Sequence, residues 1–303
     1  MNDMQLDCLI IGGGPAGLAA ATYLARFRRR AMVIDAGRSR AKWISSIRNY
    51  PGFPGGLSGL ELLGHMHAQA QRFGAIIETG TVSEIKRSGD GFVVSACGRT
   101  LSAANILTAA GVEDKLPDVP GFSEELIMRD KVRLCPICDG FEFIGKTIAV
   151  WGEAERAAKE ALFLRSFSEA ITLLVASGCI GASDRKGLAE AGVEVVETPV
   201  TRLEEPEDAI VTVHPDGQTN WFDGVYLAMG SRPRTDLALM LGGEVNRAGC
   251  LVVDAHQETT VPGLFSAGDI VNELNQISVA VGHAAIAATA IHNRIAERRS
   301  ERL

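Results

Sequence analysis

Two cysteines stand close enough in the sequence to act as one chemical group. Cys135 and Cys138 are separated by a proline and an isoleucine, whereas the other four cysteines stand singly. Two intervening residues allow the thiols to close a short disulfide ring, so that one thiol attacks and the other resolves the mixed disulfide. Asp139 follows directly, and its carboxyl group is suited to move a proton when the disulfide opens. The stretch predicts a redox-active pair with Cys135, Cys138 and Asp139 as catalytic residues.

The same cysteine spacing also occurs in zinc sites and in pairs without reactivity. A zinc site needs a second such pair, or two histidines at ligand spacing. The six histidines are dispersed, and His65 and His67 would point to different faces of a helix. We therefore expect no metal site, and an inert pair is the other alternative.

A glycine-rich turn near the N-terminus predicts a dinucleotide site. Residues 12–17 read G-G-G-P-A-G, after a short apolar run and before an alanine-rich helical segment. In this G-x-G-x-x-G pattern Gly12 makes the tight turn and Gly14 lets the backbone approach a pyrophosphate. Gly17 allows the helix to pack closely on the strand. Because strand, turn and helix occur in the required order, a purely structural turn is the weaker alternative.

Further residues extend this predicted site. Pro15 and Ala16 open the helix, whose N-terminus presents free N–H groups to phosphate. Asp35 ends the next apolar run, where it would accept a hydrogen bond from a ribose hydroxyl. Gly268 and Asp269 form a second strand-and-turn motif, although such a pair alone is more often an ordinary turn. FAD is long enough to meet both motifs, so we predict FAD as the cofactor.

The predicted elements place both motifs in nucleotide-binding folds. At 303 residues the chain exceeds the usual size of one domain. A strand-helix-strand order at the N-terminus recurs at 147–175. We predict an α/β protein with two Rossmann-like, three-layer (β/β/α) nucleotide-binding domains, the second inserted into the first. The FAD-binding domain would comprise 1–115 and 238–303, and 116–237 would form an NAD(P)H-binding-like domain that carries the C-x-x-C pair.

Composition narrows the classes of partner. The net charge of −7 gives no reason to expect nucleic acid or an anionic membrane surface as a partner. No apolar run approaches the roughly 18–20 residues of a membrane span. The chain enters a strand-like run almost at once, which leaves no room for a signal peptide. A cytoplasmic enzyme is the expectation.

Three more motifs accompany the turn and the cysteine pair. They are N-Y-P-G-F-P at 49–54, A-A-G at 109–111, and Gln276 with the alanine-rich helix that follows it. Together the motifs resemble the low-molecular-weight thioredoxin reductases, flavoproteins with FAD and C-x-x-C, over nearly the whole chain. The resemblance implies that Cys138 exchanges electrons with the isoalloxazine, that Cys135 attacks the partner disulfide, and that the adjacent carboxyl serves as acid and base. It also implies a homodimer and a second domain that rotates.

The resemblance and the glycine pattern together assign a set of residues to FAD. For Arg40 and Lys42, solvated surface charges are the alternative. The expected FAD-binding residues are Gly12, Gly14, Pro15, Ala16, Gly17, Asp35, Ala36, Arg40, Lys42, Asn49, Val82, Ala109, Gly111, Gly268, Asp269, Gln276 and Ile277.

The second nucleotide motif departs from the family pattern. Residues 152–157 read G-E-A-E-R-A where the family has G-x-G-x-x-A. Ala154 replaces the glycine that lets backbone approach phosphate, and Glu153 and Glu155 bring negative charge to a helix N-terminus. The stretch 175–179, V-A-S-G-C, lacks the arginines that hold the 2′-phosphate of NADPH in the family. We predict a subgroup with a degenerate NADPH site that does not use NADPH efficiently.

This departure changes the expected reaction partners. The leading interpretation is reduction of a thioredoxin-like protein, or another disulfide, with electrons from a carrier such as ferredoxin. Asn275, where NADPH-dependent reductases usually carry arginine, favours that subgroup. The alternative is an oxygen-dependent oxidase of a small-molecule dithiol; a flavin-bound sensor and a flavin hydroxylase remain as further classes. A basic tail, either a solvated helix end or a docking site for an acidic carrier, contains Arg294, Arg298, Arg299 and Arg302.

Overall fold

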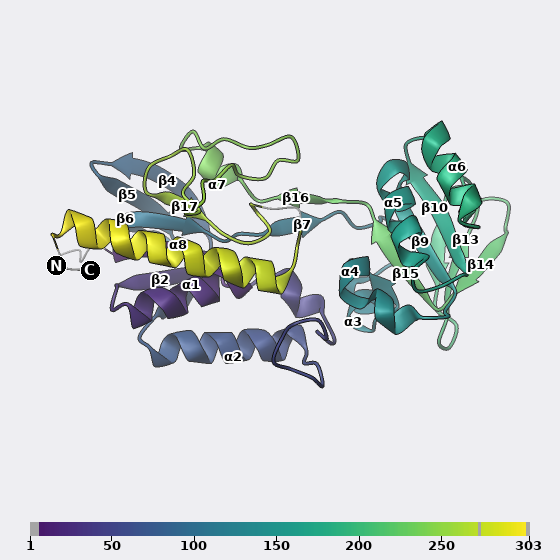
Figure 1. Ribbon diagram of the computed structural model, residues 1–303, viewed down its shortest axis with the longest axis horizontal. Coiled ribbons are helices and arrows are strands. Elements are labelled where there is room, and N and C mark those ends of the chain that lie inside the picture. The colour runs from purple at the N-terminus through teal and green to yellow at the C-terminus, as the bar shows by residue number, and fades with distance from the viewer. Residues whose placement is uncertain (1–5, 272–273, 301–303) are drawn as a thin grey trace. The chain divides into compact units, whose positions relative to one another are not determined.

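The protein divides into two compact units in the computed structural model, which describes residues 6–271 and 274–300 (Figure 1). Unit 1 consists of Met1–Lys42, Ser58–Glu113 and Arg232–Leu303, and unit 2 consists of Trp43–Leu57 and Asp114–Ser231. No helix in the described ranges is both long enough and apolar enough to cross a membrane. Each unit has its own sheets and its own core.

Unit 1 is built on one seven-stranded sheet. Its strands are β1 (Leu6–Ile11), β2 (Ala31–Asp35), β3 (Ile76–Thr79), β4 (Val82–Ser88), β5 (Gly91–Ala96), β6 (Arg99–Thr108) and β17 (Leu264–Ser266). The order is β3-β2-β1-β6-β5-β4, and β17 also pairs with β6. β3, β2, β1, β6 and β17 run parallel, whereas β4 and β5 form an antiparallel hairpin that continues into β6. The carboxyl ends of the parallel strands therefore share one edge, where ligands bind in such sheets.

Helices and loops cover both faces of this sheet. The helices of unit 1 are α1 (Pro15–Arg26), η1 (Arg40–Trp43, which ends at the unit boundary), α2 (Gly59–Arg72), α7 (Asp236–Leu239) and α8 (Ile277–Arg298). α1 packs against α8 and α2. Its contact with α8 is rich in alanine, including Ala20 and Ala284, whose small side chains let the two backbones approach closely. Ser58 and Glu61 form a capping box that starts α2.

Unit 2 contains a parallel sheet between a helical layer and a small antiparallel sheet. The strands are β8 (Val132–Arg133), β9 (Ile148–Glu153), β10 (Ile171–Ser177), β11 (Glu194–Val196), β12 (Arg202–Glu204), β13 (Ile210–Val213), β14 (Thr219–Phe222) and β15 (Gly224–Ala228). The parallel order is β11-β10-β9-β15-β8, and β12-β13-β14 form the second sheet. The helices are α3 (Glu124–Met128), α4 (Pro136–Asp139), η2 (Gly140–Phe143), α5 (Ala154–Leu164) and α6 (Ala182–Glu190).

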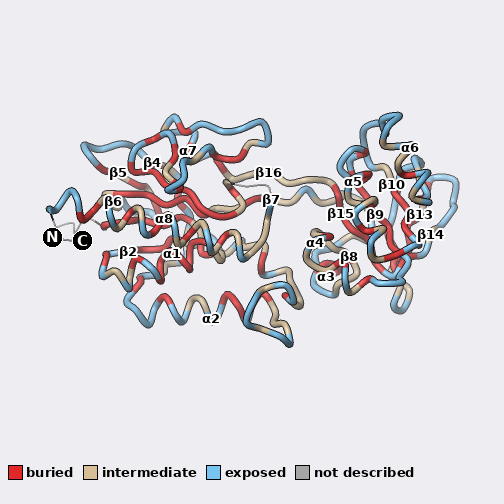
Figure 2. The backbone as a smooth tube through the Cα atoms, in the orientation of Figure 1, coloured by how far each residue is buried: buried red, intermediate tan, exposed pale blue. Residues whose placement is uncertain are grey.

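The core of unit 2 explains its three layers. Alternate residues of the central strands face opposite sides, so Val150 packs with α5 and α6 whereas Trp151 packs with β12, β13 and β14. The central strands are buried on both faces (Figure 2). β7 (Val112–Asp114) and β16 (Ser231–Pro233) pair with each other where the chain passes between the units. The predicted α/β fold with two Rossmann-like domains is confirmed.

One segment falls in a different unit from the one predicted. Residues 43–57 group with unit 2, although the predicted boundaries assigned them to the first domain. The Trp43 ring packs against the unit 2 core, and its Nε1–H donates to Glu124 Oε2 at 3.2 Å. The Ser45 hydroxyl donates to the Asp130 carboxylate, with O–O distances of 2.5 and 2.6 Å. These are single side-chain contacts without periodicity, so no pattern along the chain indicates them.

Candidate active site

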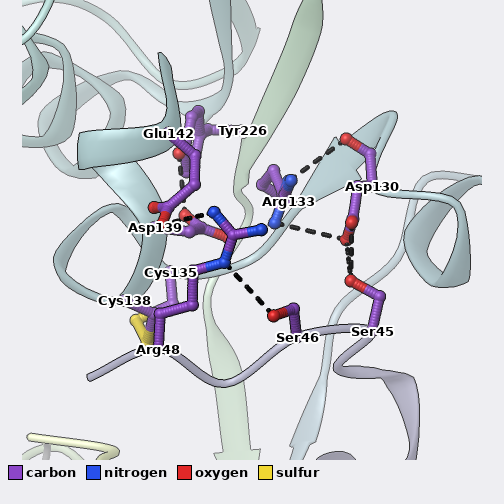
Figure 3. Close-up of polar contacts among 10 residues, drawn as sticks. All are labelled: Ser45, Ser46, Arg48, Asp130, Arg133, Cys135, Cys138, Asp139, Glu142 and Tyr226. Carbon is purple, nitrogen blue, oxygen red and sulfur yellow. Dashed lines mark hydrogen bonds and ion pairs between the residues drawn. A yellow bond between two sulfur atoms is a disulfide. The ribbon is translucent and has the colours of Figure 1, made fainter. Parts of the chain in front are cut away.

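Cys135 and Cys138 form a disulfide at the start of α4 (Figure 3), with their Cα atoms 5.3 Å apart. Cys135 is the N-cap residue with extended backbone, and Pro136 follows at the first helical position. Proline suits this position because the first helical N–H has no partner within the helix. The Cys138 N–H donates to the Cys135 carbonyl at 3.0 Å, which closes the turn. The predicted thiol pair is therefore a disulfide held by local backbone geometry.

The Asp139 carboxyl is held by two donors. Tyr226 Oη donates to Oδ1 at 2.7 Å, and Arg133 Nη1 donates to Oδ2 at 2.8 Å (Figure 3). Only 17% of the Asp139 side chain is exposed. Burial raises the pKa of Asp139 above its ordinary value, although Arg133 and Tyr226 act in the opposite direction. The group is thus able to hold a proton at a pH where an exposed aspartate is ionised.

Arg133 connects this carboxyl to a second acidic residue. Its Nη1 lies 3.2 Å from Asp130 Oδ1, and its Nε donates to the Asp130 carbonyl at 3.1 Å. The guanidinium lies over the ring of Phe143, 5.2 Å from the centroid. Because Ser45 donates to the same Asp130 carboxylate, a polar chain runs from Ser45 through Asp130 and Arg133 to Asp139.

Tyr226 reaches Asp139 from the core of unit 2. It lies on β15, is fully buried, and packs edge-on against Phe143 at 5.6 Å between ring centroids. Burial and the neighbouring Asp139 raise the pKa of Tyr226 further above its already high ordinary value. The hydroxyl therefore keeps its proton and remains available as a hydrogen-bond donor.

A further ion pair lies beside the same element. Arg48 Nη1 is 3.3 Å from Glu142 Oε1, and Arg48 Nε donates to Ser46 Oγ at 3.2 Å (Figure 3). The Glu142 side chain is 19% exposed, whereas that of Arg48 is 59% exposed. Through this ion pair, residues 43–57 also contact η2, the short helix that follows the cysteine pair.

The sequence did not predict Arg133, Tyr226 or Glu142 as site residues. Arg133 is the one charge between Val132 and Leu134, and Tyr226 is a polar group within an aliphatic strand. A polar side chain in a buried run requires a partner, which is the only signal that points to these residues.

The first glycine-rich turn is built as the pattern predicts. Gly12 has φ +107°, and a Cβ there would lie 2.4 Å from the Ala109 carbonyl oxygen. A Cβ on Gly17 would lie 1.9 Å from the Gly12 carbonyl oxygen, so α1 approaches the strand too closely for any side chain. At Gly14 the nearest atom to such a Cβ is Ser39 Oγ at 3.3 Å. The turn thus leaves space on the Gly14 side at the N-terminus of α1, which fits the pyrophosphate of FAD.

Asp35 stabilises this turn from the end of β2. Its Oδ1 accepts hydrogen bonds from the N–H groups of Gly13 at 3.1 Å and Gly37 at 3.0 Å. Lys42 Nζ donates to the Gly37 carbonyl at 2.7 Å. Asp35 therefore lies beside the turn, and Lys42 holds the following loop.

The Gly268-Asp269 motif comes to the start of α1. Gly268 has φ +86°, and a Cβ there would lie 3.0 Å from the Ala16 Cβ. Asp269 Oδ2 is 3.5 Å from Arg40 Nη1. The two predicted FAD motifs, which are about 250 residues apart in the chain, thus meet within unit 1.

The remaining predicted FAD residues lie at element ends in unit 1, with one exception. Asn49 is exposed and belongs to residues 43–57 of unit 2, because the contacts of that segment hold it there. In unit 1, Pro15 begins α1, Ala36 follows β2, Val82 begins β4, Ala109 and Gly111 follow β6, Gln276 is the N-cap of α8 and Ile277 is its first residue.

The second turn has a different backbone from the first. Gly152 remains in β9, paired with Val175 and Ala228, and a Cβ there would lie 2.2 Å from the Ala228 carbonyl oxygen. α5 begins at Ala154, whose buried methyl lies 3.6 Å from the position of a Cβ on Gly178. β9 ends at Glu153 and α5 begins at the next residue, so no glycine loop separates the strand from the helix.

The arginines near the C-terminus have partners within unit 1. Arg302 lies outside the described residues. Of the others, Arg294 pairs with Glu258 at 2.9 Å, Arg298 donates to the Asp90 carbonyl at 3.3 Å, and Arg299 pairs with buried Asp7. These contacts account for three of the arginines as internal ties. Across residues 6–271 and 274–300, no group of three or more His, Cys, Asp or Glu side chains could hold a metal ion.

The chain is similar to known proteins along nearly its whole length. The family model of pyridine nucleotide-disulphide oxidoreductases matches residues 6–284. Thioredoxin reductase of Aquifex aeolicus (strain VF5) is 31% identical over 312 residues, covering 95% of this chain and 93% of that protein. The structure of thioredoxin reductase from Streptococcus pyogenes MGAS5005 has a TM-score of 0.89 at 28% identity, covering 98% of this chain and 100% of that one. The structure of the atypical thioredoxin reductase TRi from Desulfovibrio vulgaris Hildenborough has a TM-score of 0.55 at 33% identity, covering 97% of this chain and 99% of that one. The chain therefore belongs to the pyridine nucleotide-disulphide oxidoreductase family and is a thioredoxin reductase-like, flavin-dependent disulfide oxidoreductase.

Proposed function

We propose that this protein passes electrons between bound FAD, the Cys135–Cys138 pair and a disulfide or dithiol partner, without efficient use of NADPH. The observation that carries the proposal is the disulfide at the start of α4. It is directly followed by the Asp139 carboxyl, which accepts hydrogen bonds from Arg133 and Tyr226. The proposed partner is a thioredoxin-like protein, and the proposed class of electron donor is a ferredoxin-type carrier.

The residues of unit 1 would bind FAD. Its pyrophosphate would lie against Gly14 and the N-terminus of α1, with the Gly268-Asp269 motif alongside. When bound, FAD supplies or accepts the electron pair. Asp35 orients the turn through Gly13, and α8 begins beside the second motif.

The cysteines and Asp139 would perform the exchange. Reduction of the disulfide takes two electrons and two protons and yields two thiols. By resemblance to the family, Cys138 faces the flavin and Cys135 attacks the partner. Asp139 would give a proton to the thiolate that leaves, and take it back when the pair is reoxidised. Its raised pKa favours this exchange because the neutral form is accessible in the folded protein.

The second turn supports the part of the proposal that concerns NADPH. A pyrophosphate needs a glycine at which the backbone is open, and here the Ala154 methyl occupies the start of α5. Glu153 and Glu155 also place carboxylates at the end of the helix that would otherwise attract a dianion. The oxygen-dependent oxidation of a small dithiol is the second candidate, because it too requires no pyridine nucleotide.

A stopped-flow experiment tests this function. The purified yellow protein is mixed anaerobically with NADPH, NADH or a reduced dithiol, and the flavin absorbance is followed. We expect the dithiol to bleach the flavin and either nucleotide to react at least about a hundred-fold more slowly. Fast bleaching by NADPH would refute the NADPH part, and a Cys138→Ser variant that still reacts with dithiol would refute the role of the pair. Rapid recolouring by air after dithiol reduction would favour the oxidase.

A further inference from the structure

We propose that Arg133 and Tyr226 are positioning residues for Asp139: Arg133 fixes Oδ2 as a permanent acceptor, and Tyr226 makes Oδ1 the oxygen that takes up and releases the proton. This inference rests on the proposed function, in which Asp139 moves protons for the disulfide. It assigns separate tasks to the two carboxyl oxygens.

The chemistry of the two donors distinguishes the oxygens. A guanidinium carries five N–H donors, has no acceptor and stays charged, so a proton on Oδ2 would face an N–H at 2.8 Å. A phenol hydroxyl can donate or accept. When Oδ1 gains a proton from hydronium, an O–H bond of hydronium breaks, an O–H bond to Oδ1 forms and water is released. The carboxyl charge rises from −1 to 0, and the Tyr226 hydroxyl turns so that its oxygen accepts from Oδ1–H. The Tyr226 proton stays on Tyr226 throughout.

The packing around the Asp139 carboxyl holds both hydrogen-bond donors in place. The Arg133 side chain is 15% exposed and is held by Asp130 and the Phe143 ring as well as by Asp139. Tyr226 is fully buried in β15, with Phe143 against its edge. Neither donor is free to swing away, so the carboxyl keeps one orientation relative to the adjacent cysteine.

Charged and hydrogen-bonding groups reach Asp139 from three elements. Arg133 extends from β8 with Asp130 behind it, Tyr226 comes from β15, and Glu142 comes from η2. Glu142 opposes ionisation of Asp139, and Glu142 itself pairs with Arg48. Arg133 is the principal group that favours the ionised form, and the Tyr226 hydrogen bond is the second.

Infrared titration of the oxidised holoenzyme tests the inference directly. The carbonyl band of the neutral Asp139 carboxyl is identified as the band that Asp139→Asn removes, and its intensity is followed against pH. Tyr226→Phe keeps the ring and deletes the hydroxyl, so we expect the midpoint to move to higher pH and the band frequency to change. Arg133→Met should move the midpoint further in the same direction, and Arg133→Lys should restore most of it. Tyr23→Phe, an exposed tyrosine of unit 1, is the matched control and should change neither quantity.

Kinetics provide a second readout. The rate of flavin reduction by dithiol is measured against pH, and the pH-dependent step that disappears in Asp139→Asn is assigned to Asp139. Tyr226→Phe should shift this step along the pH axis. In the Asp139→Asn background, Tyr226→Phe should have no effect on the profile. An unchanged infrared midpoint and frequency in Tyr226→Phe would overturn the inference, as would a Tyr226→Phe effect that persists without Asp139. A protein that shows the infrared shift but passes no electrons from dithiol to flavin would refute the proposed function and support the positioning roles.

Discussion

Asp139 links the stability of unit 2 to pH, with a definite sign. Burial raises its pKa in the folded protein, so the folded state binds the proton more tightly than the unfolded chain. The stability that this group contributes is complete below the unfolded pKa of about 3.9 and is lost as pH rises through the folded value. Each unit by which the two pKa values differ corresponds to about 1.4 kcal/mol.

Asp139→Asn should therefore flatten the pH dependence of unfolding. Asparagine stays neutral, so the variant should gain stability relative to the wild type as pH rises from about 4 through the folded pKa of Asp139. Urea unfolding followed by tryptophan fluorescence at several pH values measures the difference. Asp208→Asn, at an exposed position in unit 2, is the control and should run parallel to the wild type. Parallel curves for Asp139→Asn as well would contradict the prediction.

At this scale the sequence predicts the chemical groups better than their partners. Cys135, Cys138 and Asp139 are adjacent in the chain, so their spacing alone indicates a common site. Tyr226 is 87 residues from Asp139, and only the pairing of β15 with β8 and β9 brings it there. No local pattern encodes a contact that depends on strand order.

Among the elements, the first glycine turn gives a matched pair of substitutions. A Cβ on Gly17 in α1 would overlap the Gly12 carbonyl, whereas one on Gly64 in α2 would meet no atom within 4 Å. We expect Gly17→Ala to destabilise the protein by about 1–3 kcal/mol, and to weaken FAD binding. Gly64→Ala should stabilise it by about 0.5–1 kcal/mol, because alanine favours a helix interior over glycine.

Thermal unfolding and FAD titration of the two variants measure these effects. Equal stability of Gly17→Ala and Gly64→Ala would show that the close approach of α1 to the turn has no energetic weight. The turn was predictable because G-x-G-x-x-G encodes backbone conformation locally. The strand-like backbone of Gly152 was not, because it depends on pairing with Ala228 in a neighbouring strand.

For the whole molecule, the three tryptophans provide a selective probe. Trp43, Trp151 and Trp221 all belong to unit 2, whereas the predicted FAD residues other than Asn49 lie in unit 1. A ligand stabilises the part that binds it, by about 2.7 kcal/mol at a hundred times its dissociation constant. Excess FAD should therefore raise the midpoint of flavin release by more than it raises the midpoint of the tryptophan fluorescence transition. A fluorescence midpoint that rises equally with FAD would contradict this separation.

The predicted and observed divisions of the chain differ most where secondary structure does not mark the boundary. The parallel strands of both sheets follow apolar runs that are recognisable in the sequence. The grouping of residues 43–57 with unit 2 was not predicted, because they contain no strand and only the last residue of η1. Their place depends on Trp43, Ser45 and Arg48, each of which makes an individual contact.

β17 and α8 follow all of unit 2 in the chain, which has a consequence for biosynthesis. Synthesis proceeds from the N-terminus, so β1, the glycine turn and α1 emerge long before the helix that covers α1. The last residue of unit 2, Ser231, leaves the ribosome while unit 1 still lacks β17 and α8. Unit 2, which contains the cysteine pair, is therefore fully synthesised before the last strand of the unit 1 sheet and the helix that packs on α1.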